Sequence, residues 1–176
     1  MDHFYQRISG WFDYSSIYRR MVELAPPQAH FVEIGTYMGC SAAFLAVEII
    51  NSGKDIKLSC VDSETRYKEN LECVMHMIDV ITIGSPAAAA GFADESVDFI
   101  WIDGDHDEQA FRDDVQHWLP KLRQDGYLGG HDYDHPAHPG IREVCRLLLP
   151  GHAVIPADEP GGMVSSFLWQ KPKLAD

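Results

Sequence analysis

Three things are scarce in this 176-residue sequence: cysteine, positive charge and long apolar runs. The four cysteines lie far apart and form no C-x-x-C pair, which favours free thiols in a reducing compartment over a disulfide framework. No apolar stretch approaches the length of a membrane-spanning helix, and the first residues lack a signal-peptide pattern. We therefore expect a cytoplasmic protein that makes no contact with membranes.

Lysine and arginine together number 14, against 27 acidic residues, so the formal net charge is −13. Because no basic run is present either, we expect no non-specific binding to nucleic-acid phosphates or to anionic lipid surfaces. This charge balance suits a cation, such as a metal ion or a sulfonium, better than a polyanion. The expected partner is a small-molecule substrate.

Short apolar runs alternate with helical spacing along most of the chain. Strands are predicted at residues 31–34, 56–61, 80–83, 97–102, 127–130, 153–155 and 163–169, with turns at 124–126 and 159–162. Helices are predicted within 3–25 (one or two, with Ser15 or Ser16 as a cap) and at 42–50, 67–77, 86–92, 111–123 and 141–148. This alternation predicts an α/β fold with a doubly wound, mostly parallel seven-stranded sheet. The last two strands have no helix between them, which predicts an antiparallel C-terminal strand.

The first predicted strand ends in a loop with two glycines that leads directly into a helix. The loop reads Glu33-x-Gly35-x-x-x-Gly39-x-Ser41 and lacks the middle glycine of the G-x-G-x-x-G dinucleotide fingerprint. Glycines let a backbone approach a ligand closely, and the free N–H groups of a helix N-terminus favour an anionic group. The pattern predicts a nucleotide-binding corner, with an ordinary strand–helix turn as the alternative.

Each predicted parallel strand ends in a polar residue. These residues are Glu33, Asp62, Ser85, Asp103 and the pair His131-Asp132. In an open α/β sheet such ends meet at the edge where ligands bind. Asp62, after the second strand, is placed to accept both hydroxyls of a ribose; an exposed turn aspartate is the alternative.

The segment from Asp103 to His106, together with His131-Asp132, combines carboxylates and imidazoles at neighbouring strand ends. Carboxylate oxygens favour Mg²⁺ or Mn²⁺, so we predict a site for a hard divalent cation. A zinc site is less favoured, because the run has neither thiolates nor H-E-x-x-H spacing. Asp105 or Asp134 would be able to complete the shell, although Asp105 is also placed to cap the following helix.

The glycine loop resembles motif I of the class I S-adenosylmethionine-dependent methyltransferases, and the His/Asp segments resemble the metal-dependent group that includes macrolide sugar and catechol O-methyltransferases. The resemblance covers roughly residues 28–170 and implies a Rossmann-like core there, within one domain of residues 1–176 whose first 27 residues form a helical cap. It implies S-adenosylmethionine as cofactor, contacted by Glu33, Gly35, Thr36, Tyr37, Gly39, Ser41, Asp62, Ser63, Gly84, Ser85 and Asp103. It also implies that Asp103 and Asp132 hold Mg²⁺ or Mn²⁺ and that His106 is the general base. His131 is the candidate for a third ligand.

The expected reaction is metal-assisted O-methylation of a small polar acceptor, such as a sugar or a catechol. Two alternatives remain open: a non-catalytic nucleoside-binding module, and a metal-dependent hydrolase or lyase that uses the His/Asp cluster. The aromatic residues Trp11, Phe12 and Tyr14 either line the mouth of the site or pack the N-terminal helices onto the core. Because the cap is short, either the site is open or a second copy of the chain covers it in a homo-oligomer.

Overall fold

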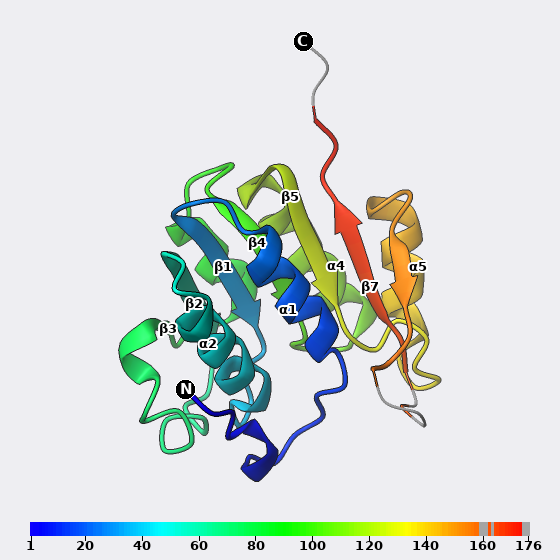
Figure 1. Ribbon diagram of the computed structural model, residues 1–176. Helices are drawn as coiled ribbons and strands as arrows, with labels where there is room; N and C mark the ends of the chain where they lie inside the picture. The colour runs from blue at the N-terminus through cyan, green and yellow to red at the C-terminus, as the bar shows by residue number, and fades with distance from the viewer. Residues whose placement is uncertain (159–161, 163, 174–176) are drawn as a thin grey trace.

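A computed structural model describes residues 1–158, 162 and 164–173, and one seven-stranded sheet forms its centre (Figure 1). The strands are β1 (Ala29–Ile34), β2 (Ile56–Val61), β3 (Ile78–Ile81), β4 (Val97–Ile102), β5 (Leu122–Gly130), β6 (Ala153–Ile155) and β7 (Ser166–Gln170). Their order across the sheet is β3-β2-β1-β4-β5-β7-β6. The first five run parallel, and β7 is antiparallel to both of its neighbours. This arrangement confirms the predicted fold class.

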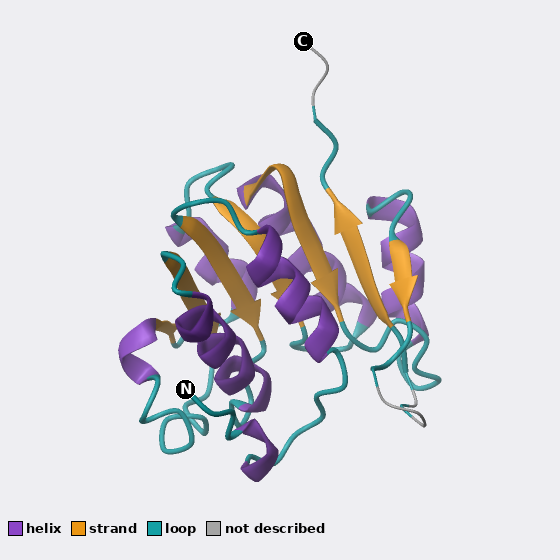
Figure 2. Ribbon diagram, in the orientation of Figure 1, coloured by secondary structure: helices purple, strands orange, loops and turns teal. Residues whose placement is uncertain are grey.

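Helices cover both faces of the sheet (Figure 2). One face carries α1 (Ser15–Leu24) and α2 (Cys40–Ser52), and the other carries α3 (Ser85–Ala88), α4 (Glu108–Trp118) and α5 (Pro139–Leu148). Short 3-10 turns lie at η1 (Tyr5–Arg7), η2 (Met75–Met77), η3 (Ala89–Gly91) and η4 (Leu119–Lys121). Each face buries its own apolar cluster, because parallel strands flanked by helices present apolar side chains on both sides.

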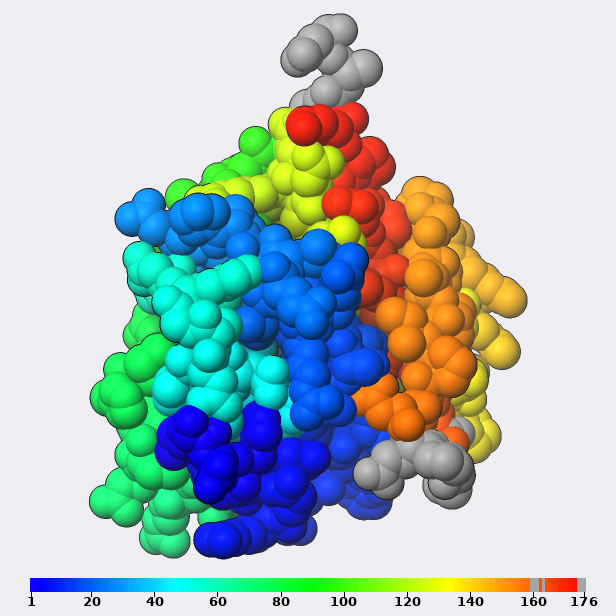
Figure 3. Space-filling model, viewed as in Figure 1, coloured from blue at the N-terminus to red at the C-terminus, as the bar shows by residue number. Residues whose placement is uncertain are grey.

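The N-terminal residues pack against α2, as the space-filling view shows (Figure 3). The His3 ring stacks on Phe44 with ring centroids 4.5 Å apart. Tyr14 is buried in the core, whereas Trp11 is 87% exposed, so the N-terminal aromatic residues take both of the roles considered for them. Within the part of the chain that the structure describes, no helix has the length and apolar character needed to cross a bilayer.

The start of α1 is capped by a residue from the far end of the chain, and the predicted cap by Ser15 or Ser16 is wrong. No side chain of the N-terminal segment caps this helix. Instead the carboxylate of Asp158, after β6, accepts hydrogen bonds from the Ser15 hydroxyl (2.8 Å), the Ser16 N–H (2.7 Å) and the Ser16 hydroxyl. The two serines therefore tie α1 to the loop after β6.

The helix predicted at 67–77 is also wrong, because turns and η2 occupy this crossover. Val74 N–H bonds to Leu71 O and Met77 N–H to Val74 O, both at 2.9 Å, in the i→i+3 pattern of tight turns. Tyr67, Leu71 and Val74 are nevertheless all buried. The spacing of apolar residues thus identified which residues face the core. A run of turns buries those residues as well as a helix would.

Other boundaries moved by a few residues. Strand β3 ends at Ile81, and the helix predicted to continue to residue 123 gives way to η4 and β5. The predicted turn at 124–126 lies inside β5, at a register shift where Val97 pairs with Leu122 and Phe99 with Tyr127. The final strand begins at Ser166 instead of residue 163; the predicted turn at 159–162 lies largely outside the described residues.

Candidate functional site

Two cavities open side by side at the carboxyl ends of β1, β2, β4 and β5. The first has a volume of about 500 Å³ and lies over β1, β2 and the loop after β3. The second, of about 680 Å³, lies toward the loop after β5 and the N-terminal segment. Gly35, Tyr37, Asp103 and Gly104 line both, so they form a shared wall. Gly35 and Asp132 thus open onto one cleft, as the predicted site requires.

Gly35 forms the closest contact in this shared wall. Its φ is +86°, and a Cβ there would lie only 2.0 Å from the backbone oxygen of Asp103. Its N–H donates to Val61 O at 2.9 Å, and Asp103 N–H donates to Ile34 O at 2.8 Å. No side chain fits between these backbones, so glycine is required for the loops after β1 and β4 to meet.

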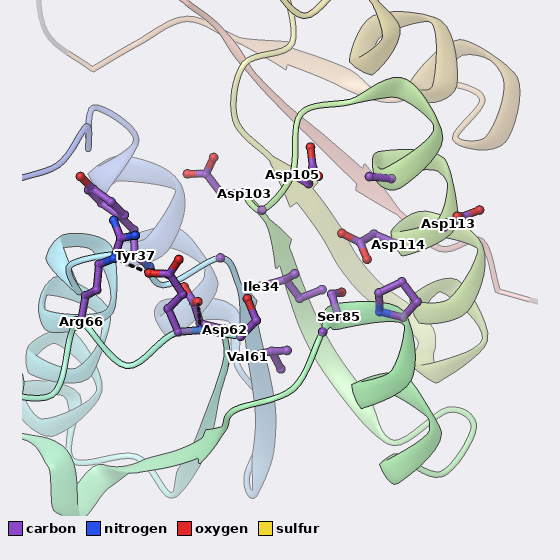
Figure 4. A pocket seen from close by; sticks show the side chains of 17 residues that line it. Ile34, Tyr37, Val61, Asp62, Arg66, Ser85, Asp103, Asp105, Asp113 and Asp114 are labelled. Carbon is purple, nitrogen blue, oxygen red and sulfur yellow. Dashed lines mark hydrogen bonds and ion pairs between the residues drawn. The ribbon is translucent and has the colours of Figure 1, made fainter.

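Asp62 holds the loop after β1 in place from the end of β2. Its Oδ2 accepts from the N–H groups of Thr36 (3.0 Å) and Tyr37 (2.7 Å), and its Oδ1 accepts from Glu64 N–H (2.8 Å). Figure 4 shows this carboxylate on the wall of the first cavity, below Tyr37. A carboxylate accepts about four hydrogen bonds, so one position remains for a ligand. Ser63 lines the same cavity.

The other predicted cofactor contacts divide into three groups. Gly84 and Ser85 line the first cavity, and Thr36 and Ser41 line the second. Gly39, at the start of α2, packs on Leu71 and lines neither cavity.

Glu33 lies beneath the floor of the site and is not among the residues that line either cavity. Its side chain is fully buried, and its Oε2 accepts from the Tyr18 hydroxyl at 2.7 Å. Burial raises the pKa of this carboxyl to about 7. Its place in the structure is that of a buried polar support under the glycine loop.

The second cavity brings together the three predicted metal ligands. Asp103, His131 and Asp132 each offer a ligand atom, and these atoms lie within 4.8 Å of one another. Asp103 ends β4, and the His131-Asp132 pair follows β5. Two carboxylates and one imidazole, all from adjacent strand ends, are a donor set that suits Mg²⁺ or Mn²⁺.

His106 lies against the same two carboxylates. Its Nε2 is 3.0 Å from Asp132 Oδ2 and 3.4 Å from Asp103 Oδ1. Hydrogen bonding with Asp103 and then with Asp132 raises the pKa of His106 to about 10, against the opposing effect of burial. Burial acts to raise the pKa of Asp132, but hydrogen bonds from His106 and His131 hold it well below its usual range.

His131 is clamped between two carboxylates, one of which the sequence did not reveal. Its Nδ1 lies 3.0 Å from Asp132 Oδ2, and its Nε2 lies 2.9 Å from Asp13 Oδ1. Burial acts to lower the pKa of His131, but hydrogen bonding to Asp132 and the surrounding carboxylate charges outweigh it and raise the pKa to about 8. The partner on Nε2 orients the ring so that Nδ1 faces Asp132.

Asp13 and Tyr14 belong to the site; Asp13 was not predicted as a site residue, and Tyr14 was considered only for the mouth of the site or for packing. The buried Tyr14 hydroxyl donates to Asp103 Oδ2 at 3.0 Å. Both residues line the second cavity. The available signal was the interruption of helical spacing at Asp13-Tyr14, beside two further aromatic residues, since polar breaks next to aromatic clusters often lie at ligand sites.

Three histidine rings form a ladder along the outer wall of the second cavity. His138 stacks on His106 with centroids 4.7 Å apart and on His135 with centroids 4.6 Å apart. None of the described residues lining this cavity is lysine or arginine. Asp134 accepts from Ser165 and Asp105 from the Asp107 N–H, so neither completes the cluster of ligand atoms.

Comparisons with known proteins agree with this geometry. A family model described as a methyltransferase domain matches residues 32–133, more than half of the chain. No curated protein matches the sequence.

Among solved structures, a Corynebacterium glutamicum protein matches with a TM-score of 0.73 at 12% identity, over 97% of this chain and 86% of its own. A Thermotoga maritima SAM-dependent O-methyltransferase matches with a TM-score of 0.68 at 13% identity, over 96% and 68%. A cofactor-bound protein from MTB matches with a TM-score of 0.72 at 15% identity, over 95% and 84%. At these identities the likeness shows a shared fold.

Proposed function

Because this chain belongs to the class I S-adenosylmethionine-dependent methyltransferases, we propose that it methylates a hydroxyl oxygen of a small polar acceptor with the help of a divalent cation. The observation that carries the proposal is the clustering of three ligand atoms within 4.8 Å, in a cavity that shares a wall with the cofactor cavity. The cofactor occupies the first cavity in this proposal, and the acceptor occupies the second.

The first cavity suits the nucleoside part of the cofactor. Its volume of about 500 Å³ lies within the usual range for small-ligand sites. Asp62 offers a carboxylate at the end of β2, the position that accepts ribose hydroxyls in nucleotide-binding sheets. Gly35 and Asp103 line both cavities, so the sulfonium end of the cofactor would meet the acceptor beside these two residues.

The residues around the second cavity fit a divalent cation. Asp103 and Asp132 would hold it, with His131 as the third protein ligand. A cation bound there lowers the pKa of a coordinated hydroxyl and orients it. Tyr14 steadies one carboxylate by donating to Asp103, and Asp13 fixes the His131 ring through Nε2.

His106 is the general base in this proposal. Its Nε2 lies 3.0 Å from Asp132 Oδ2, and the residue lines the acceptor cavity. Hydrogen bonding to Asp103 and Asp132, and after it their charge, raises the pKa of His106. His106 would become a base at neutral pH if a cation held by Asp103 and Asp132 offset their charge.

The acceptor proposed is a neutral, hydroxyl-bearing molecule of sugar or catechol size. The absence of lysine and arginine among the described lining residues disfavours anionic acceptors such as phosphates and carboxylates. The histidine ladder and the exposed Trp11 offer flat surfaces on which such a ring packs. A 680 Å³ cavity accommodates a single ring system.

Direct binding of metal and cofactor tests the proposal before any acceptor is known. Calorimetry should detect Mn²⁺ binding to the wild-type chain, and Asp132→Ala should weaken it at least about tenfold, the usual cost of losing a ligand or its partner. S-adenosylhomocysteine should bind both proteins within about twofold, because Asp132 lies outside the first cavity.

Asp94→Ala is the matched control, because Asp94 is an exposed acid, paired with Lys121, before the opposite end of β4. It should leave both affinities unchanged. With catechol or glucose as acceptor, chelation should abolish methyl transfer. Mn²⁺ affinity that survives Asp132→Ala, or methyl transfer that survives chelation, would remove the metal from the mechanism.

A further inference from the structure

Asp114 is a buried acid on the wall of the first cavity, and nothing in the proposed mechanism uses it. It lies in the middle of α4, so it does not cap a helix, and it is only 4% exposed. Figure 4 shows its carboxylate pointing from α4 toward the cavity, whereas the neighbouring Asp113 points away. A Cβ on Gly104 would lie 3.8 Å from Asp114 Oδ2, so this oxygen reaches the loop after β4.

A chain of hydrogen bonds fixes how this wall presents its polar atoms. The Trp118 indole N–H donates to the Ser85 hydroxyl oxygen at 2.9 Å. The same hydroxyl bonds to the Asp114 carboxylate. Asp114 and Trp118 are four residues apart on one face of α4, so both reach Ser85. A serine hydroxyl has a single proton. Because Ser85 donates this proton to Asp114, it is not able to donate a hydrogen bond to a ligand.

The Asp114 carboxylate is able to accept more hydrogen bonds than it receives. Because the group is buried, an acceptor without a donor costs free energy. Burial raises the pKa of its carboxyl to about 6; the acids Asp113 and Asp105 add to the effect, while Ser85 and His117 oppose it. At neutral pH the group is therefore a carboxylate with only one fixed side-chain donor. A buried carboxylate is stabilised by a further N–H donor, and a ligand in the first cavity is able to supply one.

The surroundings of Asp114 suit a flat heterocycle. Pro86 and Ala110, both on the same side of the cavity, are small or rigid apolar residues. Asp62 lies across the cavity from Asp114 (Figure 4). With the ribose at Asp62, a base would extend toward Ser85 and α4, and its edge would face the carboxylate.

We propose that Asp114 is a specificity-determining residue, which accepts a hydrogen bond from the exocyclic 6-amino group of adenine and so rejects a base that carries a 6-oxo group. The inference rests on the assignment of S-adenosylmethionine to the first cavity. A 6-oxo base would place a carbonyl oxygen against the carboxylate, with Ser85 unable to donate, so two acceptors would face each other. Sites built around one hydrogen-bond polarity reject the opposite one strongly.

The experiment compares S-adenosylhomocysteine with S-inosylhomocysteine by calorimetry at pH 7.5, without metal. The wild-type chain should bind the adenosyl compound at least about 30-fold more tightly. Asp114→Asn should reduce that preference to within about threefold, because an amide is able to present either its oxygen or its N–H₂ group. The diagnostic result is a gain in affinity for the inosyl compound, which a misfolded variant does not produce.

Asp94→Asn is the control for loss of an acid, since Asp94 is exposed, pairs with Lys121 at 2.7 Å and lies outside the first cavity. It should preserve the adenosyl preference. Equal wild-type affinities for the two compounds, or an unchanged preference in Asp114→Asn, would overturn the role of Asp114 alone. Failure of the wild-type chain to bind either compound would overturn the cofactor assignment as well. Because no metal is present, the outcome is independent of the metal proposal.

Discussion

The two cavities share a wall but are held together in different ways. In the first, the Asp62 carboxylate accepts hydrogen bonds from three backbone N–H groups. In the second, His106 and His131 lie between Asp103, Asp132 and Asp13, so the walls are pairs of titratable side chains. The cofactor side is therefore preorganised by the backbone, and the acceptor side depends on proton and cation occupancy.

Because of this difference, we expect cofactor affinity and the rate of methyl transfer to respond differently to pH and to chelators. Cofactor affinity should vary little with chelators, or with pH above the pKa of about 6 of Asp114, because backbone N–H groups do not titrate. Methyl transfer should vary strongly with both, because the pKa values of His106 and His131 are raised by carboxylates that a cation would also use. Substitutions in each cavity and in the shared wall test this expected difference.

The largest effect is expected where the two sides meet, at Gly35. In Gly35→Ala the new Cβ would lie 2.0 Å from Asp103 O, so the loops after β1 and β4 must separate. We expect a loss of unfolding free energy of about 4 kcal/mol or more, measured by urea denaturation, together with loss of cofactor binding.

Gly53→Ala is the control for backbone conformation alone. Gly53 also has a positive φ, +65°, but a Cβ there has nothing within 4 Å. It should cost only about 1 kcal/mol and leave binding intact. Similar losses in the two variants would mean that strain, and not the contact with Asp103, makes Gly35 necessary.

The next effect concerns only the acceptor side. His106→Gln keeps a polar side chain of similar length but removes the proton acceptor from beside Asp132. We expect kcat for methyl transfer to fall about 10²-fold or more at pH 7.5, the usual contribution of a general base. Affinity for S-adenosylhomocysteine should stay within about twofold.

His76→Gln serves as the control for this variant, because His76 is an exposed histidine in η2. Its kcat should match that of the wild type. A His106→Gln enzyme with a near-normal kcat would require another group to accept the proton.

The complementary effect is expected on the cofactor side. Asp62→Ala removes the acceptor for the N–H groups of Thr36, Tyr37 and Glu64 and for the ribose. We expect affinity for S-adenosylhomocysteine to fall about 30-fold, equivalent to about 2 kcal/mol, by calorimetry. Mn²⁺ affinity should be unchanged, because the metal ligands lie in the other cavity.

Asp79→Ala tests whether loss of any nearby acid has the same effect. Asp79 lies on β3, is exposed and pairs with Lys57 at 3.2 Å. It should alter neither affinity. If Asp62→Ala weakened Mn²⁺ as much as the cofactor, the separation between the two cavities would be wrong.

The predictable part of the site is the part carried by strand ends. Apolar runs that stop at Asp62 and Asp103 mark both the strand and the edge where it ends, so the sheet and these two acids follow from local patterns. Gly35 is predictable for a related reason, since a glycine between a strand and a helix signals a close backbone approach.

The residues that escaped prediction depend on contacts between distant segments. Asp13 reaches His131 across 118 positions of sequence, and Asp158 caps α1 from 142 positions away. In the sequence alone, Asp114 is one of several acids on an amphipathic helix. Only the fold shows that Ser85 lies beside it. The burial of Glu33 likewise depends on a distant segment, because the Tyr18 hydroxyl donates to its Oε2 from α1.

The smallest expected effect comes from Tyr14, which supports the acceptor side without a charge. Its hydroxyl donates to Asp103 Oδ2 at 3.0 Å, and burial followed by the nearby Asp103 charge raises its pKa well above the usual value. The tyrosine is therefore neutral over the whole working pH range and acts only as a donor. Tyr14→Phe keeps the ring that packs 4.5 Å from Trp101 and removes one hydrogen bond.

We expect Tyr14→Phe to lower Mn²⁺ affinity about threefold to tenfold and to change stability by about 1 kcal/mol or less, as for one hydrogen bond. Cofactor affinity should be unaffected. Tyr18→Phe is the matched comparison, because the Tyr18 hydroxyl donates to Glu33 beneath the floor and touches neither cavity. It should alter stability without altering Mn²⁺ affinity. Equal Mn²⁺ affinities in the two variants would mean that the Asp103 carboxylate is positioned by β4 alone, and that the N-terminal segment covers the acceptor cavity without tuning it.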